Sequence, residues 1–553
     1  MKPEQVTDFL EQGLLVSPEL LTEQIDPTQL FLPGPQEGPA VLNKIFFHLL
    51  STKNTSEWNW IEFERAITFK EKGRSVKTYE RFMQLVRPGI PVLALPSALP
   101  PLTISVSPPI LQPIVPAVQQ TTPSSAVTDP YPVIVLKTFK EDLKKREVGD
   151  FVLHFRGRYE ALRKLLMHRA ELHDGLTSIH KIATKEQREE VALIGIVFEK
   201  RLTKNGHLEL QLEDITGSIK VFITKDRKDA YERAQDVALD EVIGIRGTYG
   251  KNVVFANTLL FPDVPSDHPL KKGHEEVYAA FISDVHVGSK KFLEKEFLSF
   301  IDWLNGNVKD SCLSSVPAEK VKYLFVVGDL VDGVGVYPGQ EKELSLTDVF
   351  QQYQRAAELF GLIRPDVKII LCPGQHDALR NSEPQPPLSK DYAPGLHALP
   401  NMILVGNPTL VNIGSTQDFD GINVLMYHGA SFHYFIDTID RLRLGKARDH
   451  PSLLMKFLLQ KGHLAPSHAA TVYVPSLAND PLVIDPIPDI FACGAMHRSD
   501  ISQYHNVTTI NGSCWQAKTD FQEKTGNNPD FCKVPCVNLK TREITVLEFY
   551  RGA

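Results

Sequence analysis

Five short apolar runs in the second half of the chain end in residue types that bind metal ions. They are FISDVHVG (281–288), YLFVVGDLVDG (323–333), IILCPGQHD (369–377), INVLMYHG (422–429) and DIFACGAMH (489–497). Runs of this length, rich in β-branched residues, predict strands buried on both faces. Amphipathic spacing between them predicts helices at 290–307 and 346–363. This alternation predicts an α/β domain over 274–553 with a largely parallel sheet and polar side chains at the strand ends.

Residues 133–265 predict a small β domain. EVALIGIVFEKRL, the turn Asn205-Gly206 and HLELQLEDI form a hairpin pattern, because Asn-Gly tolerates positive φ. Two further stretches, SIKVFITK and EVIGIRGTYGKNVVFANTLLF, extend this pattern to about five strands, and a helix at 159–172 precedes them. This set favours an OB-fold barrel, which binds single-stranded nucleic acid or proteins. Three aromatic residues fit a stacking surface or a core equally well: Phe198, Phe222 and Tyr249.

The amino-terminal part predicts two different segments. Residues 1–87 predict a small helical domain, with Ser17-Pro18 as a helix start and amphipathic spacing at 41–50 and 60–69. In residues 88–132, twelve of 45 residues are proline and Asp129 is the sole charged residue. Such a composition excludes a helix or a central strand and predicts an extended linker, either a plain spacer or a segment lying on a partner surface.

Composition limits the class of protein. The net charge of −7 excludes a protein that coats nucleic acid through bulk positive charge, although local basic patches remain open. No stretch approaches the roughly 20 apolar residues of a membrane helix, so we expect no membrane partner. The start MKPEQVTDFLEQ carries acidic residues where a signal peptide has an apolar core. We therefore expect a cytoplasmic protein.

The polar residues at the strand ends predict a metal centre. Asp284 and His286 lie two positions apart, so on a strand they share one face. A lone His at a strand end is usually structural, but five strand ends in order, each with such residues, indicate a site. Carboxylate, imidazole and amide donors suit Mn²⁺ or Fe²⁺ better than Ca²⁺. The other donors are Asp329, Gln375, His376, His428 and His497.

This order of motifs resembles the calcineurin-like metallophosphoesterase family. Asp-x-His, Gly-Asp, a Gly-x-His-Asp-like element, His and Gly-x-x-His follow one another. The resemblance is closer to the small subunits of archaeal family D DNA polymerases, and eukaryotic replicative B-subunits share their last two domains. The stretches that carry it are GDLVDGVGVYPGQEKEL (328–344), PGQHDALRNSEPQPPL (373–388), KGHLAPSH (461–468) and WQAKTDFQ (515–522). The implied fold is a multidomain chain: a helical domain, a linker, an OB-fold barrel and an α/β metallophosphoesterase sandwich.

The resemblance implies a 3′→5′ exonuclease that proofreads for a separate polymerase subunit. It implies two divalent ions, with Mn²⁺ as the expected metal and Fe²⁺ or Mg²⁺ as alternatives. The implied ligands are Asp284, His286, Asp329 and His497 for the first ion, and Asp329, Gln375 and His428 for the second. His376 is the implied general acid, and Asp332 is expected to shape the loop after Asp329.

The implied partners are those of replication. They are the large catalytic subunit, primer-template DNA with a single-stranded 3′ end, and the sliding clamp through the holoenzyme. The resemblance also implies a location at the archaeal nucleoid. No polymerase active site is evident in the sequence, so synthesis belongs to the large subunit.

Two positions depart from the family pattern. Gln375 stands where the wider family has Asn, and it keeps the amide oxygen on a longer side chain. Ala495 stands at the first His of the Gly-His-x-His motif, so the second ion loses an imidazole and binds more weakly. The change is either natural or engineered to remove the exonuclease, and the otherwise intact ligand set favours the second. A non-catalytic scaffold subunit is the main alternative function. A free-standing phosphatase fits the ligands but not the barrel.

Overall fold

The computed structural model describes residues 14–16, 40–42, 130–139, 145–182, 184–308, 313–476 and 479–550. The chain divides into two compact units, 1–122 and 123–553. In the first unit, Leu14–Val16 (β1) pairs in parallel with Ala40–Leu42 (β2). The predicted helix at 41–50 is therefore wrong at its first two residues. So short an apolar run fits the 3.6-residue period of a helix and the two-residue period of a strand equally well. The remainder of the predicted helical domain, and the linker up to Asp129, lie outside the described residues.

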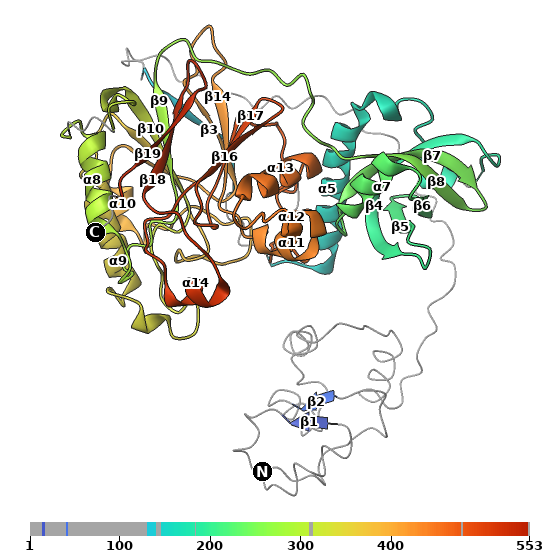
Figure 1. Ribbon diagram of the computed structural model, residues 1–553, viewed down its shortest axis with the longest axis horizontal. Helices are drawn as coiled ribbons and strands as arrows, with labels where there is room; N and C mark the ends of the chain where they lie inside the picture. Colours follow the sequence, from blue (N-terminus) through green and yellow to red (C-terminus); the bar gives the residue numbers. More distant parts are fainter. Residues whose placement is uncertain are drawn as a thin grey trace, which may run out of the picture. The chain divides into compact units, whose positions relative to one another are not determined.

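Five strands of the second unit close into the predicted barrel (Figure 1), in the order β4-β5-β6-β8-β7. Gly206 has φ +74° in the turn of the first hairpin, which confirms the Asn-Gly prediction. Tyr249 is 5% exposed and belongs to the core, whereas Phe198 is 63% exposed. The strands are Glu190–Leu202 (β4), Leu208–Asp214 (β5), Gly217–Ile223 (β6), Val242–Gly250 (β7) and Val253–Leu260 (β8).

Short and long helices accompany the barrel. Val148–Met167 (α5) precedes it and starts earlier than the predicted helix at 159–172. The final predicted residues form a separate 3-10 turn, Ala170–Leu172 (η4). Ile179–Ile182 (α6) and Lys228–Gln235 (α7) complete this set.

Two six-stranded sheets make up most of the rest of the chain. The first has the order β12-β11-β10-β9-β18-β19. Its strands are Tyr278–Ile282 (β9), Val321–Val327 (β10), Lys368–Cys372 (β11), Met402–Leu404 (β12), Lys533–Asn538 (β18) and Ile544–Glu548 (β19). The second has the order β16-β17-β15-β14-β13-β3. Its strands are Val133–Thr138 (β3), Thr409–Ile413 (β13), Ile422–Tyr427 (β14), Ile490–Cys493 (β15), Asp500–Tyr504 (β16) and Val507–Asn511 (β17).

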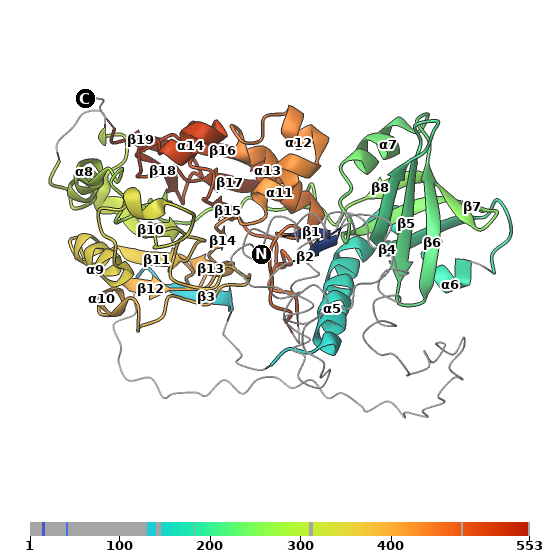
Figure 2. The ribbon, with the colours of Figure 1, turned by 90° about the horizontal axis from the view of Figure 1, so that it is seen from below.

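The two sheets pack face to face around one apolar core. Phe281 and Phe325 stack in the first sheet with ring centroids 4.8 Å apart, and they share a core cluster with Val424 and Ala492 of the second. Helices cover the two outer faces, as Figures 1 and 2 show. Those on the first sheet are Glu294–Leu304 (α8) and Val349–Phe360 (α9), which confirm the predicted helices. Those on the second include Phe432–Thr438 (α11), Asp440–Leu444 (α12) and Pro451–Lys461 (α13).

The remaining elements are short. They are Ala318–Lys320 (η6), Gln340–Lys342 (η7), Pro394–His397 (α10) and Asp520–Thr525 (α14). Among the described residues, no helix is long and apolar enough to cross a membrane.

The segment that precedes the barrel is tied to the α/β sheets. β3 pairs with β13, although the predicted range 133–265 grouped it with the barrel. Its β-branched sequence predicts a strand but does not specify the partner strand. In α5, Arg158 Nε lies 2.6 Å from Asp480 Oδ2, and His463 Nε2 lies 2.9 Å from the same oxygen. All three side chains are buried, so this contact joins α5 to the loop after α13.

Candidate metal centre

The predicted strand ends meet at one edge of the two packed sheets. Asp284 and Asp329 each lie two residues beyond the neighbouring parallel strands β9 and β10. His428 directly follows β14, and His497 lies four residues beyond its parallel neighbour β15. Within the described residues, three groups of donors have ligand atoms no more than 4.8 Å apart. They are Asp284/His286/His497, Asp284/Asp329/His428 and His286/Asp329/His376.

The backbone at these positions is strained. Asp284, His286, Asp329 and His497 have φ between 50° and 54°, in the left-handed region that most residues avoid. Each such residue costs about 1–3 kcal/mol and persists where the surrounding fold imposes it. Ala495 has φ 63° and shares this conformation. The backbone therefore aims the side chains inward at an energetic cost, as is typical of functional sites.

Three glycines leave room for the polar side chains. A Cβ on Gly328 would lie 2.2 Å from His428 Nδ1, and a Cβ on Gly374 would lie 2.2 Å from Asp329 Oδ1. On Gly494 it would lie 2.8 Å from Asp284 Oδ2. The glycines in the sequence motifs are thus explained by close packing around the donor atoms.

His428 lies between two carboxylates. Its Nε2 is 3.1 Å from Asp329 Oδ2 and 3.8 Å from Asp284 Oδ1, and its Nδ1 contacts the Val327 carbonyl oxygen at 2.8 Å. Burial alone would lower the pKa of His428, but Asp329 and Asp284 outweigh it and raise the pKa to about 10. Burial would likewise raise the pKa of Asp329, but the facing imidazoles, His428 first, hold it below its usual range.

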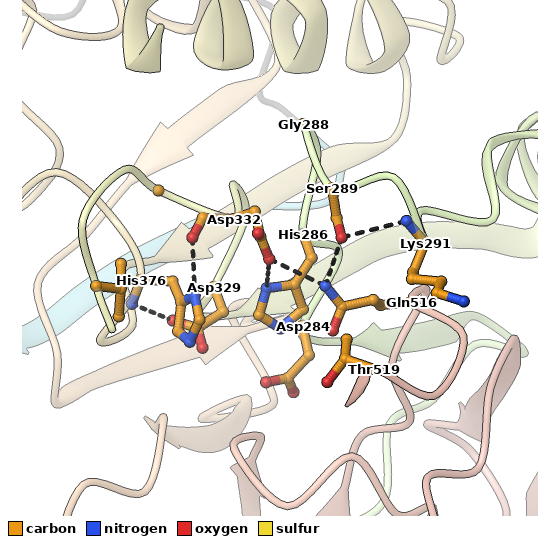
Figure 3. Close-up of polar contacts among 12 residues, drawn as sticks. Asp284, His286, Gly288, Ser289, Lys291, Asp329, Asp332, His376, Gln516 and Thr519 are labelled. Carbon is orange, nitrogen blue, oxygen red and sulfur yellow. Dashed lines mark hydrogen bonds and ion pairs between the residues drawn. The ribbon is translucent and has the colours of Figure 1, made fainter. Parts of the chain in front are cut away.

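His286 and His497 contact each other beside Asp284. Their Nε2 atoms are 3.2 Å apart, and His497 Nε2 lies 3.3 Å from Asp284 Oδ1. His286 Nδ1 lies 3.1 Å from Asp332 Oδ1 (Figure 3), and burial lowers the pKa of His286. Burial would also lower the pKa of His497, but Cys514 and Asp284 raise it above the usual range. Asp332 therefore contacts a donor residue and can orient its ring, a contact beyond the predicted role of shaping the loop after Asp329.

The stretch 515–522 supplies contacts that the sequence reasoning missed. Gln516 Nε2 donates to Asp332 Oδ1 at 3.0 Å and to Ser289 Oγ at 2.8 Å, as Figure 3 shows. Gln522 Nε2 lies 2.9 Å from His497 Nδ1. The sequence contained a signal for this segment, because WQAKTDFQ is one of the stretches that resemble the polymerase subunits. The spacing of residues along the chain, however, predicted no role for either glutamine.

His376 lies beside the cluster and Gln375 precedes it. The backbone N–H of His376 donates to Asp329 Oδ1 at 2.8 Å, and its Nδ1 lies 2.8 Å from the Asp332 carbonyl oxygen. The Gln375 side-chain nitrogen is buried without a hydrogen-bond partner. Asp377, which had no predicted role, accepts hydrogen bonds from Tyr353 Oη at 3.1 Å and from the Gly374 N–H at 2.9 Å. It anchors the loop that carries Gln375 and His376.

Ala495 lies against the same cluster. Its backbone N–H donates to Asp284 Oδ1 and Oδ2 at 3.2 and 3.1 Å, while its methyl group offers no donor atom. A Cβ built on Gly429 would lie 3.3 Å from the Ala495 Cβ, so the side chain at 495 points toward the end of β14. The position predicted to lack a ligand therefore borders Asp284 and the strand end that carries His428.

The donor set fits divalent metal ions. His428 Nε2 is buried and makes no hydrogen bond of good geometry, although it faces Asp329. In the metal-free site a proton on this nitrogen offsets the facing carboxylates, and a divalent cation bound by the same atoms would take its place. Two carboxylates with several imidazoles are typical of Mn²⁺, Fe²⁺ and Zn²⁺ sites.

Comparisons with known proteins identify the family of this chain. The family model for the B subunits of DNA polymerases alpha and epsilon matches residues 279–502. A structure described as a novel archaeal phosphodiesterase aligns with 49% of this chain and 98% of its own, with 13% identity and a TM-score of 0.25. The DNA polymerase II small subunit of Halobacterium salinarum is 37% identical over 73% of this chain and 75% of its own length.

The DNA polymerase II small subunit of Methanothermobacter thermautotrophicus is also 37% identical, over 416 residues. That match covers 75% of this chain and 82% of the relative. A match of this identity and extent shows common descent along most of both chains. This chain belongs to the family of DNA polymerase II small subunits, the small subunits of archaeal family D polymerases.

Proposed function

We propose that this chain is the proofreading subunit of a family D polymerase, a metal-dependent 3′→5′ exonuclease whose activity is reduced by Ala495. In this proposal the two packed sheets are a calcineurin-like metallophosphoesterase sandwich and the barrel is an OB-fold. The observation that carries it is the convergence of Asp284, Asp329 and His428 with two further imidazoles at strained strand ends. A large catalytic subunit supplies the polymerase chemistry, and the complex acts on primer-template DNA and meets the sliding clamp.

Two ions fit the donor groups. Asp284, His286, Asp329 and His497 would hold the first, and Asp329, Gln375 and His428 would hold the second. The expected metal is Mn²⁺. When bound, a pair of such ions supplies an activated water and stabilises charge on the phosphate. Asp329 belongs to the donor group with His376 and also to the donor group with His428. A carboxylate shared by two donor groups could serve as a ligand to both ions.

His376 is positioned to act as the general acid. Its Nδ1 faces the Asp332 carbonyl oxygen at 2.8 Å, and a carbonyl only accepts, so Nδ1 carries a proton. In the imidazolium form, Nε2 carries the second proton and can deliver it to the departing 3′ oxygen of the adjacent nucleotide. The backbone N–H bond to Asp329 fixes the distance between the acid and the carboxylate that holds the ions.

The test restores the missing donor. We expect Ala495→His, reconstituted with the large subunit and Mn²⁺, to degrade a mismatched 3′ end at least about tenfold faster than the chain as written, because a metal centre gains an imidazole ligand. A histidine tolerates the left-handed φ of 63° at this position. The matched control, Asp329→Asn in the Ala495→His background, should return cleavage to background. Equal background cleavage by the chain as written and by Ala495→His would refute the exonuclease.

A non-catalytic scaffold is the second candidate function, and the methyl group at Ala495 favours it. In that case the chain stabilises the large subunit, and its metal groups are remnants. Polymerase activity of the complex separates the two roles, since a scaffold sustains synthesis whether or not position 495 carries an imidazole. Retained synthesis with no gain of cleavage on Ala495→His would support the scaffold.

A further inference from the structure

The loop 333–339 presents apolar side chains beside His376. Its sequence is GVGVYPG, and none of these residues is charged. We propose that Val334, Val336 and Tyr337, the base platform, bind the nucleobase of the nucleotide whose 3′ oxygen departs. The inference rests on the proposed function, because it takes His376 as the acid that protonates this oxygen. It deepens that function by naming the residues that hold the end of the strand.

Two contacts place this loop next to His376. The rings of Tyr337 and His376 meet edge to face, with centroids 6.4 Å apart and planes at 63°. A Cβ built on Gly333 would lie 2.3 Å from the His376 carbonyl oxygen and 2.9 Å from Val336 Cγ2, so the Val336 side chain also lies close to this backbone. His376 in turn meets the ring of His286, with centroids 4.8 Å apart. The base platform therefore borders the candidate metal centre on the side of the proposed acid.

Two buried glutamines hold the loop in place. Gln340 Oε1 accepts from the Val336 N–H at 2.9 Å, and its Nε2 donates to the Asp332 carbonyl oxygen at 2.8 Å. Gln352 Oε1 accepts from the Gly333 N–H at 2.9 Å, and its Nε2 donates back to the Gly333 carbonyl oxygen at 3.1 Å. The loop is thus fixed before a substrate arrives, and this lowers the entropic cost of binding one.

The apolar side chains of this fixed loop face solvent. Val334 is 48% exposed and Val336 is 39% exposed. The Tyr337 ring is partly buried, and its hydroxyl donates to Glu343 Oε2 at 3.0 Å. A single exposed valine is ordinary, but two valines and an aromatic ring beside a candidate centre form a surface that a flat apolar group can cover. Covering it removes apolar area from water and stabilises the bound state.

A nucleobase is the group that fits this surface. The base platform has no cation to hold a phosphate, whereas the faces of a base pack on aromatic and apolar side chains for about 1–3 kcal/mol. In 3′→5′ cleavage the departing oxygen belongs to the penultimate nucleotide, so the base next to His376 is the penultimate one. In a paired duplex its neighbours cover both faces of this base. The base platform therefore favours strand ends that have unstacked, as mismatched ends do most readily.

Photo-cross-linking locates the bound base without any cleavage. The full chain, reconstituted with the large subunit and Mn²⁺, is irradiated with a single strand that carries 5-iodouracil at the penultimate position and a terminal phosphorothioate linkage that resists hydrolysis. We expect the cross-link within 333–339, at Tyr337, because the aromatic ring is the reactive side chain there. Moving the 5-iodouracil to the 5′ end of the strand should abolish this cross-link. Absence of any cross-link within 333–339 from the penultimate position would overturn the inference.

A double-mutant cycle measures the contact as a change in affinity. A short single strand, with or without a base at its penultimate position, is bound to the full chain. We expect removal of the base to weaken binding to the parent about tenfold, but to a variant with Val334→Thr, Val336→Thr and Tyr337→Leu about threefold or less. Val148→Thr, at a position on α5 that is 83% exposed, is the matched control and should keep the tenfold effect. Equal effects of base removal in the parent and the triple variant would overturn the inference.

Failure of this inference can be told apart from failure of the proposed function. A cross-link within 333–339 in a chain that stays inactive after Ala495→His would support the base platform while refuting the exonuclease. Cleavage by Ala495→His with no cross-link within 333–339 would support the exonuclease and overturn the base platform.

Discussion

His428 Nε2 lies 3.1 Å from Asp329 Oδ2, and both side chains are buried. Because the carboxylates raise the pKa of His428 to about 10, the metal-free site holds a proton there at neutral pH. A divalent ion needs the lone pair of Nε2, so its binding must release this proton.

We therefore expect Mn²⁺ binding near pH 7 to release about one proton from His428, and Mn²⁺ affinity to rise as the pH rises towards 10. Calorimetric titrations in two buffers with different ionisation enthalpies measure the release. His428→Asn, which keeps a polar side chain without this proton, is the control and should lower the number of released protons by about one, leaving the release from His497, whose pKa is also raised. A heat of binding that is the same in both buffers would contradict the assignment.

The same proton makes metal-free stability depend on pH. The folded pKa of His428 lies above its ordinary value of 6.5, so its contribution to the free energy of unfolding is complete below pH 6.5 and is lost as the pH rises to about 10. Denaturant unfolding in the presence of a chelator should therefore show a lower stability at pH 9.5 than at pH 6.5. His428→Asn should flatten this difference, and an unchanged slope in that variant would assign it to other groups.

Gly374→Ala should damage the centre through packing alone. The new Cβ would lie 2.2 Å from Asp329 Oδ1 and 2.5 Å from the Asp329 backbone N. Overpacking of this kind costs about 1–3 kcal/mol of stability, and here it also displaces a proposed ligand. Unfolding curves and Mn²⁺ affinity measure the two effects. Gly149→Ala is the matched control, because apart from its chain neighbours and its own helix backbone no atom lies within 4 Å of a Cβ built there, and it should lower neither quantity.

His376→Ala distinguishes a proton donor from a ligand. In the Ala495→His background we expect the variant to lose cleavage by about 10²-fold or more while Mn²⁺ affinity changes little, since general acids typically contribute 10²–10⁴-fold. The structure also groups His376 with His286 and Asp329 as possible donors. A large loss of Mn²⁺ affinity would therefore reassign His376 as a ligand.

Tyr353→Phe should loosen the loop that carries His376. The hydroxyl donates to Asp377 Oδ1 at 3.1 Å and accepts from the Ala378 backbone N–H at 2.9 Å. Removing it leaves buried polar groups without partners, at about 1–3 kcal/mol. Chemical denaturation measures the loss. Tyr231→Phe in the barrel, which gives up one partly buried bond to the Gly206 carbonyl oxygen, should cost less. Equal losses of unfolding free energy in the two variants would show that the bond from Tyr353 to Asp377 stabilises the fold no more than an ordinary, partly buried bond.

Much of the centre was predictable because its signals are local. Asp284, Asp329 and His428 follow apolar runs within two residues, and parallel pairing brings such strand ends together. The Asn-Gly turn and the apolar periodicity likewise predicted the barrel hairpin and the helices α8 and α9.

Features that depend on distant pairing were not predictable. The sequence of β3 specifies a strand but not β13 as its partner, 272 residues away at Thr409. The division of the strands between two sheets depends equally on packing. Gln516 and Gln522 gain their roles only when their segment folds back on His286 and His497, and no spacing rule joins residues so far apart.

The buried contact of Arg158, His463 and Asp480 limits how the chain can be cut into parts. A fragment that ends between the barrel and β9 would keep Arg158 but lose Asp480 and the Pro466 carbonyl oxygen, its two partners beyond α5. It would also lose Val483, which belongs to the same apolar cluster as Leu162 and Leu166 of α5. Contacts with the sheet region therefore contribute to the stability of α5 and the barrel. A fragment cut at the end of the barrel should be less stable than the same residues in the full chain.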